Sequence, residues 1–330
     1  MTSLRWFAVV CLSAAFALQA QPPARNLDLR VVAVDSAGQP VSGLTASDFK
    51  VYDNGSPQKV LSVHLNQTGG PSALVILFDL LNSSLASRGQ VWEIMKRSLA
   101  HVPSSGNLYL YLLVDDGSLY PVHPLGSAEG APDAKAAAAN WVENIASELD
   151  DAMRKTSQLR PQDLRRDSPV GISARFNATC RALDELRAHM APLAGTKELL
   201  WVTYGIPSTI PEVGHEYWDA TPTLRQLGAR FQQSGVVIYS ADPGMNLARG
   251  ILDREGLDIL TGVTGGRTFA NVDLNRAITQ AESDARTNYS VEFEPSGHSW
   301  NGKFHKLRVA VARKGVHVQA ENGYFAIAGS

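Results

Sequence analysis

Four continuous apolar runs, separated by segments with helical periodicity, constrain the fold of this chain more than any other feature. The runs are ALVILF at 73–78, LYLYLLV at 108–114, ELLWVTY at 198–204 and VVIYSA at 236–241. Strands that are apolar at nearly every position are typical of a parallel sheet covered on both faces. Apolar residues recur at helical spacing between the runs, for example in 84–102 and 223–235. We therefore expect an α/β unit with a doubly wound, mostly parallel sheet and helices on both faces.

Both ends of the chain show a different pattern, in which apolar residues alternate with polar ones. LDLRVVAV, FKVY and VLSVHL lie between residues 27 and 65, and the pattern returns after Asn288. The Asn54-Gly55 pair suits the positive φ angles of a tight hairpin. Because two or three strands alone bury too little apolar surface to be stable, we expect the two end segments to pack together into one β unit. The predicted boundaries are an N-terminal β segment at 21–70, an α/β domain at 71–287 and a C-terminal β segment at 288–330.

The first 20 residues have the pattern of a cleavable signal peptide. Arg5 precedes the 13-residue apolar stretch WFAVVCLSAAFAL, and small residues follow at the predicted cleavage sites after Ala17 or Ala20. The stretch is shorter than the ~20 residues that a membrane-spanning helix needs. We therefore predict a secreted or periplasmic protein whose mature chain has no membrane span. A formal net charge of −2 gives no indication of nucleic-acid binding.

The stretch LVILFDLLNSS at 74–84 carries the main candidate site. Its apolar run ends at Asp79, and Asn82, Ser83 and Ser84 follow. In an open parallel sheet, ligands bind beyond the carboxyl ends of the strands, near the point where the strand order reverses. We therefore expect Asp79 to lie at this functional edge of the sheet.

Several motifs together resemble a known family. They include SGLTASDFKVYDNGSPQKV before the α/β part, ILFDLLN and LLWVTYGIP within it, LTGVTGGRTF near its end, and YSVEFEPSG with GYFA in the tail. The α/β part resembles a von Willebrand factor A domain, and residues 27–327 resemble secreted bacterial, acidobacterial-type VWFA-related proteins. The resemblance implies the doubly wound fold, a secreted location and a Mg²⁺ site formed by three loops.

In the family the first loop supplies Asp-x-Ser-x-Ser to the metal, the second loop a Thr and the third loop an Asp from Thr-Asp-Gly. Asp79 and Ser83 match the first loop, but Leu81 stands where the first serine belongs. The third loop has Tyr204 in place of its Asp, and the second-loop hydroxyl matches Thr179 or Ser173. The resemblance thus implies a degenerate metal site of Asp79, Ser83 and Thr179.

Two interpretations of this loop remain. In the first, which the sequence favours, Asn82, Ser83 and Ser84 cap the following helix and Asp79 accepts hydrogen bonds from loop amides, so that no cofactor is bound. In the second, Mg²⁺ binds weakly, because one hydroxyl and one carboxylate are missing from the octahedral shell that it requires.

The functional prediction is a non-enzymatic protein-binding module that contacts an unidentified protein partner through Asn82, Ser84 and Tyr204. The alternative is a structural envelope module without a ligand site. No nucleophile–base pair indicates an enzyme, and GHSWNGKF at 297–304 fails as a phosphate-binding loop because it ends in Phe304. We expect His298 and His305 to be exposed histidines on strands.

Overall fold

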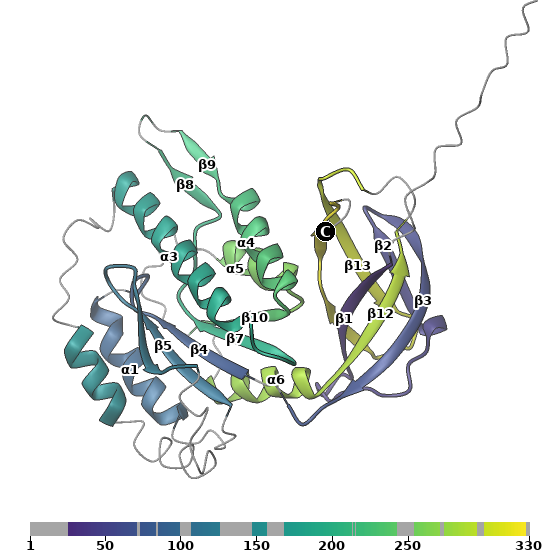
Figure 1. Cartoon of the computed structure of the whole chain (residues 1–330), viewed down its shortest axis with the longest axis horizontal. Coiled ribbons are helices and arrows are strands. Elements are labelled where there is room, and N and C mark those ends of the chain that lie inside the picture. The colour runs from purple at the N-terminus through teal and green to yellow at the C-terminus, as the bar shows by residue number, and fades with distance from the viewer. Residues whose placement is uncertain are drawn as a thin grey trace, which may run out of the picture.

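The structure, a computed structural model, shows an α/β unit beside a β unit made of antiparallel strands (Figure 1). It describes residues 26–327 except for 71–72, 84, 100–106, 126–146, 157–167, 213, 215, 243–253, 271–273 and 296–299. The predicted signal peptide at 1–20, Ser84 and His298 lie outside the described residues.

The β unit combines strands from both ends of the chain. Its curled sheet has the order β14-β1-β12-β3-β2-β13-β15. Every neighbouring pair in this sheet is antiparallel. The strands are β1 Leu27–Val34, β2 Phe49–Asp53, β3 Ser56–Gln67, β12 Thr287–Glu294, β13 Phe304–Val311, β14 His317–Ala320 and β15 Gly323–Phe325. Because β1 lies between β12 and β14, the predicted joint β unit is confirmed.

Alternation along these strands produces the core of the β unit. Val31, Val291 and Phe293 are fully buried inside the curled sheet, packed with residues from the other strands. The predicted hairpin between β2 and β3 is present, with φ angles of 47° at Asn54 and 86° at Gly55. Positive φ at both positions is typical of a turn that matches the twist of the two strands.

The α/β unit contains a six-stranded sheet of order β11-β10-β7-β4-β5-β6. The strands are β4 Ala73–Asp79, β5 Leu108–Leu113, β6 Leu119–His123, β7 Lys197–Val202, β10 Val236–Ala241 and β11 Thr268–Phe269. All pairs are parallel except β5 with β6, a short hairpin that the sequence analysis did not predict. The order reverses at β4, which places the residues after β4 at the switch point of the sheet.

Helices cover both faces of this sheet, as predicted. One face packs against α1 Leu85–Leu99, the helical residues 147–156 and α6 Leu274–Arg286. The opposite face packs against α3 Pro169–Met190, α4 Thr221–Gln233 and α5 Arg254–Val263. Alternate residues of β4, such as Val75 and Ile76, enter the two separate cores and are fully buried. Among the described helices, none is long and apolar enough to cross a membrane.

The two units meet without a long connection. Helix α6 ends at Arg286 and β12 begins at Thr287, whose Cα partner is Gln67 at the end of β3. Strand β3 therefore extends to Gln67, close to the predicted boundary of the N-terminal β segment at residue 70. On the opposite side of the junction, the backbone N–H of Asn322 donates to the Gly262 carbonyl over 2.8 Å.

A buried cluster of hydrogen-bonded arginine and acidic side chains also joins the units. Arg30 of β1 donates through Nη2 to Glu198 Oε1 of β7 over 3.0 Å and to the Asp284 carbonyl over 2.8 Å. The Glu198 side chain is fully buried, and Arg267 binds the Asp284 carboxylate over 2.7 Å. Burying these charges between the units is costly unless they remain paired, so the contact favours one relative orientation of the two units.

Candidate functional site

Asp79 ends β4 at the carboxyl edge of the parallel sheet, where the sequence predicted it. Its side chain is only 5% exposed. Oδ1 accepts a hydrogen bond from the backbone N–H of Asn82 over 2.9 Å, and Oδ2 accepts from the Asn82 amide and the Thr203 hydroxyl, each over 2.8 Å. The predicted bond between Asp79 and a loop amide is therefore present. Burial raises the pKa of Asp79, although the hydrogen bonds from Asn82 and Thr203 lower it.

The side chain of Asn82 links the first loop to α3. Its Nδ2 atom lies 2.8 Å from Asp79 Oδ2 and 3.0 Å from Thr179 Oγ1, and Thr179 is fully buried on α3. A carboxylate only accepts hydrogen bonds, so it is the NH₂ group of Asn82 that faces Asp79. The two N–H donors of this group thus lie between the two oxygens that the family resemblance assigns to a metal.

This arrangement does not fit Mg²⁺. A magnesium ion needs about six oxygen ligands in octahedral geometry, whereas the Asn82 NH₂ group presents hydrogens toward the shared space. The described residues contain no group of three or more His, Cys, Asp or Glu side chains that could hold a metal ion. Asp79 therefore has its acceptor oxygens directed at Asn82 and Thr203 rather than at a cation.

The other residues of the predicted metal loops pack in the protein core, form a local hydrogen bond or lie away from Asp79. Leu81 is 3% exposed and packs in the core beneath α3, while Tyr204 is 7% exposed and packs in the core on the opposite face. The Ser83 hydroxyl donates to the Leu80 carbonyl over 2.9 Å. Ser173 does not join Asp79 but lines a groove on the outer side of α3.

The predicted partner face requires a correction. Asn82 and Tyr204 are each only 7% exposed, so their side chains are not presented to an incoming protein. The physical reason is that Asn82 donates hydrogen bonds to the buried Asp79 carboxylate, which keeps the Asn82 side chain inside the protein. A polar residue after a strand suggests an exposed position, but here it pairs with a buried group. Ser84, the third predicted contact, lies outside the described residues.

An exposed groove lies beside this network. Its volume is about 540 Å³, and it separates the first half of α3 from the hairpin formed by β8 Thr209–Pro211 and β9 Tyr217–Asp219. The lining residues are Pro169, Val170, Ser173, Ala174, Asn177, Ile210, Pro211, Glu212 and Trp218. On α3, Asn177 of the groove lies two residues before Thr179 of the buried network, so the groove adjoins the carboxyl edge of the sheet.

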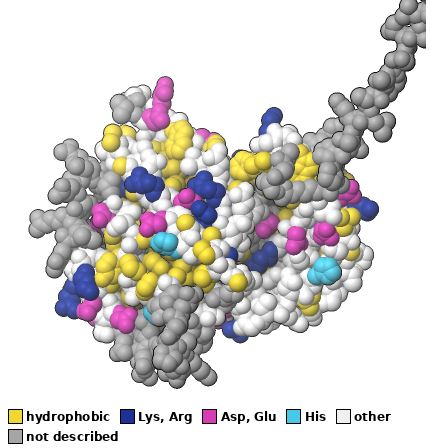
Figure 2. Space-filling view, viewed as in Figure 1, with side chains coloured by type: hydrophobic (Ala, Val, Ile, Leu, Met, Phe, Trp, Pro, Cys, Tyr) yellow, Lys and Arg dark blue, Asp and Glu magenta, His cyan; other side chains and the backbone are white. Residues whose placement is uncertain are grey.

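Large apolar side chains are unusually exposed around the groove. Val170 is 68% exposed, Tyr217 72% and Trp218 37%. Figure 2 shows hydrophobic side chains at the surface over α3 and the β8–β9 hairpin. Trp218 is held in place by an edge-to-face contact with Phe176 at a centroid distance of 5.5 Å. The sequence analysis missed this surface, although the adjacent aromatics of EYWD in a polar loop were a visible signal.

His305 also differs from the sequence prediction of an exposed strand histidine. It is 6% exposed, and its Nδ1 lies 2.8 Å from Asp53 Oδ1, while the Tyr324 hydroxyl donates to Asp53 Oδ2 over 2.9 Å. The Asn301 Oδ1 atom is 3.1 Å from His305 Nε2. The cluster joins β2, β13 and β15, because Asp53 of β2 contacts His305 of β13 and Tyr324 of β15 through its two carboxylate oxygens.

No protein-family model matches the chain, and no curated protein matches it. Similar solved structures include proximal thread matrix protein 1 from the mussel byssus, with 11% identity and a TM-score of 0.39 over 71% of this chain and 50% of that one. The human COPII-coat protein Sec24c has 12% identity and a TM-score of 0.35 over 89% of this chain and 49% of that one.

The esterase domain of a Rhodothermus marinus protein has 11% identity and a TM-score of 0.23, over 71% of this chain and 95% of that domain. The chain spans about half the length of the mussel and human proteins. At these low TM-scores the similarities support no assignment of family or function. The structure itself shows a mixed α/β chain with a second, antiparallel sheet.

Proposed function

We propose that the α/β unit is a von Willebrand factor A-like domain in which an internal hydrogen-bond network stands in place of the metal. The sequence motifs support this assignment, and so does a sheet whose order reverses at β4. Three separate segments supply Asp79, Thr179 and Thr203. The Asn82 amide joins Asp79 to Thr179, and the Thr203 hydroxyl donates to Asp79 directly. In this proposal the Asn82 NH₂ group holds together the oxygens that a cation holds in the metal-binding relatives.

We propose further that the chain is a secreted, non-enzymatic module that binds a protein partner without a metal. The exposed groove between α3 and the β8–β9 hairpin is the observation that carries this proposal. Contiguous apolar surface rimmed by polar residues is typical of protein interaction sites, and tryptophan and tyrosine are enriched where binding energy concentrates. The proposal moves the predicted partner contacts from Asn82 and Tyr204 to Val170, Tyr217 and Trp218.

Capture of envelope proteins by the immobilised protein tests this function. We expect the double variant Val170→Asp, Tyr217→Ser to lose a captured partner, because both side chains are highly exposed and contribute to binding rather than to folding. Leu65→Ser is the control, since it removes an exposed large apolar side chain from the β unit, outside the groove. The control should retain the partner. Equal capture by the double variant and the wild type would refute the proposed face.

The role of the metal is tested in the same assay. We expect capture to be unchanged by EDTA and by added Mg²⁺, and we expect titration calorimetry with Mg²⁺ or Mn²⁺ to show no saturable binding. Capture that depends on Mg²⁺ and disappears in Asp79→Ala would instead support the weak metal site of Asp79, Ser83 and Thr179.

A further inference from the structure

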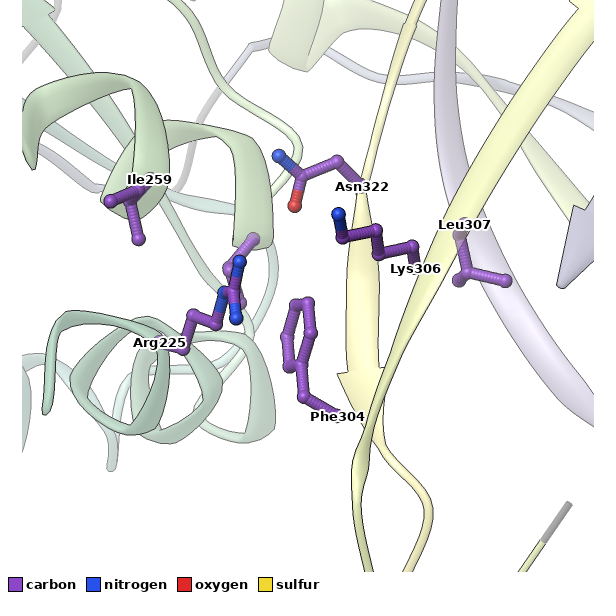
Figure 3. Close-up of a pocket in the computed structure, with 7 residues that line it drawn as sticks. Arg225, Ile259, Phe304, Lys306, Leu307 and Asn322 are labelled. Carbon is purple, nitrogen blue, oxygen red and sulfur yellow. The ribbon is translucent and has the colours of Figure 1, made fainter. Parts of the chain in front are cut away.

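A second pocket lies at the junction of the two units, away from the groove beside α3. Its volume is about 250 Å³, and it is lined by Arg225 of α4, Ile259 and Val263 of α5, Phe304, Lys306 and Leu307 of β13, and Asn322. Figure 3 shows the side chains of Arg225, Lys306 and Asn322 directed toward the same space from opposite sides. Pockets between domains are common ligand sites, because both walls contribute to the contact.

The polar groups of this pocket have one sign of charge. Arg225 and Lys306 are cations from different units, Asn322 adds an amide, and none of the described residues that line the pocket is acidic. Among the described residues, no salt bridge includes Arg225 or Lys306, and the Asp219 carboxylate interacts electrostatically with Arg225. Arg225 is half-buried and Lys306 is exposed. Two cations directed at one space repel each other, so a bound anion between them would be favourable.

The pocket is also held in shape before any ligand arrives. The guanidinium carbon of Arg225 lies 4.7 Å from the centroid of the Phe304 ring, which restrains the side chain by cation–π stacking. The backbone of Asn322 is fixed twice, because its N–H donates to Gly262 and its carbonyl accepts from Leu307 over 2.8 Å. On β13, the Lys306 N–H donates to Asn54 Oδ1 over 3.0 Å. A preorganised site loses less entropy on binding.

Size and wall chemistry narrow the class of ligand. Drug-sized ligands occupy pockets of roughly 300–1,000 Å³, so a pocket of about 250 Å³ suits a smaller molecule. The fork of Arg225 matches a planar carboxylate, whereas Ile259, Val263 and Phe304 offer an apolar wall. We propose that this junction pocket binds a small organic carboxylate with a short apolar body, held by Arg225 and Lys306 from the two units.

Titration calorimetry and amide NMR of the full chain with sodium butyrate test the proposal, and butyramide serves as the neutral analogue of the same shape. We expect saturable butyrate binding with shift changes at Phe304 and Asn322, and at least tenfold weaker binding of butyramide. Arg225→Met and Lys306→Met should each weaken butyrate at least tenfold. Lys303→Met, a nearby exposed lysine outside the pocket, should leave the affinity unchanged.

Three results would overturn this assignment. The first is an absence of saturable butyrate binding to the wild type, and the second is binding that persists unchanged in both Met variants. The third is inorganic phosphate binding as tightly as butyrate, which would assign the pocket to anions without an apolar body. Lys306 is exposed, so Lys306→Met keeps the test valid if Arg225→Met fails to fold. None of these results bears on the groove beside α3, because the two sites share no lining residue.

Discussion

At the scale of single residues, Asn82 supplies two of the hydrogen-bond donors to the buried carboxylate at the carboxyl edge of the sheet. Its side-chain amide and its backbone N–H together occupy both oxygens of the Asp79 carboxylate. A buried carboxylate that loses its donors retains its desolvation cost, which is larger than the net contribution of an ordinary hydrogen bond. Leu81, which the sequence resemblance aligns with a metal ligand, contributes packing, because it is buried in the core beneath α3.

We predict that Asn82→Ala destabilises the protein by about 2 kcal/mol, because Asp79 and Thr179 both lose a buried hydrogen-bond partner. The free energy of unfolding measured in urea checks this value. Asn177→Ala is the matched control, since Asn177 is exposed on the same helix that carries Thr179, and its effect should stay within about 0.5 kcal/mol. Equal losses in the two variants would contradict a structural role for the Asn82 amide.

At the scale of elements, the β unit depends on strands from both ends of the chain. Strand β1 lies between β12 and β14, and β3 lies between β12 and β2. Removal of the C-terminal strands would expose both edges of β1 and leave the hairpin of β2 and β3 alone. An isolated hairpin is at best marginally stable in water.

We therefore expect deletion of residues 289–330 to unfold the segment 27–65 while the α/β sheet stays folded. Hydrogen exchange of backbone amides measures this separately for each segment. Amides of β1 should exchange at the rate of unstructured chain, and amides of β4 and β7 should remain protected. Protection of β1 after the deletion would show that the N-terminal strands are stable by themselves.

The sequence was sufficient for those elements whose local pattern and tertiary surroundings agree. Continuous apolar runs predicted β4, β5, β7 and β10, and the Asn54-Gly55 pair predicted its hairpin. It was not sufficient for β6, β8 and β9, which are short and gain their order from contacts with neighbouring elements. The same holds for the candidate site. The place of Asp79 could be predicted because it directly follows the apolar run of β4. The burial of Asn82 and His305 could not, because it depends on tertiary packing.

At the scale of the whole molecule, the contact between the two units includes the buried carboxyl group of Glu198. Burial raises the pKa of Glu198 to about 8, although Arg30 lowers it. The unfolded chain releases this proton near its ordinary value of 4.5, whereas the folded protein retains it up to about 8. Between these values the folded state binds more protons, so the contribution of Glu198 to stability falls as the pH rises.

We predict that the stability of the wild type relative to Glu198→Gln decreases between pH 5 and pH 8. The decrease should reach at least about 1.4 kcal/mol, the equivalent of one pKa unit. Urea unfolding of both proteins at several pH values measures the difference. Glu216→Gln, which replaces an exposed carboxylate on the same unit, is the control for the change of charge alone. A difference that stays constant between pH 5 and pH 8 would show that Arg30 keeps Glu198 ionised throughout.

The interleaved β unit also has a consequence for the order in which the protein acquires its structure during synthesis. Gln67 of β3 pairs with Thr287 of β12, so roughly 220 residues must leave the ribosome before this contact can form. At about 5–20 residues per second, the first strands wait on the order of 10 to 45 seconds for their partners. During that interval their unpaired edges are available for wrong pairing. The α/β unit, whose strands and helices all lie within the intervening segment, is the part of the chain free to fold first.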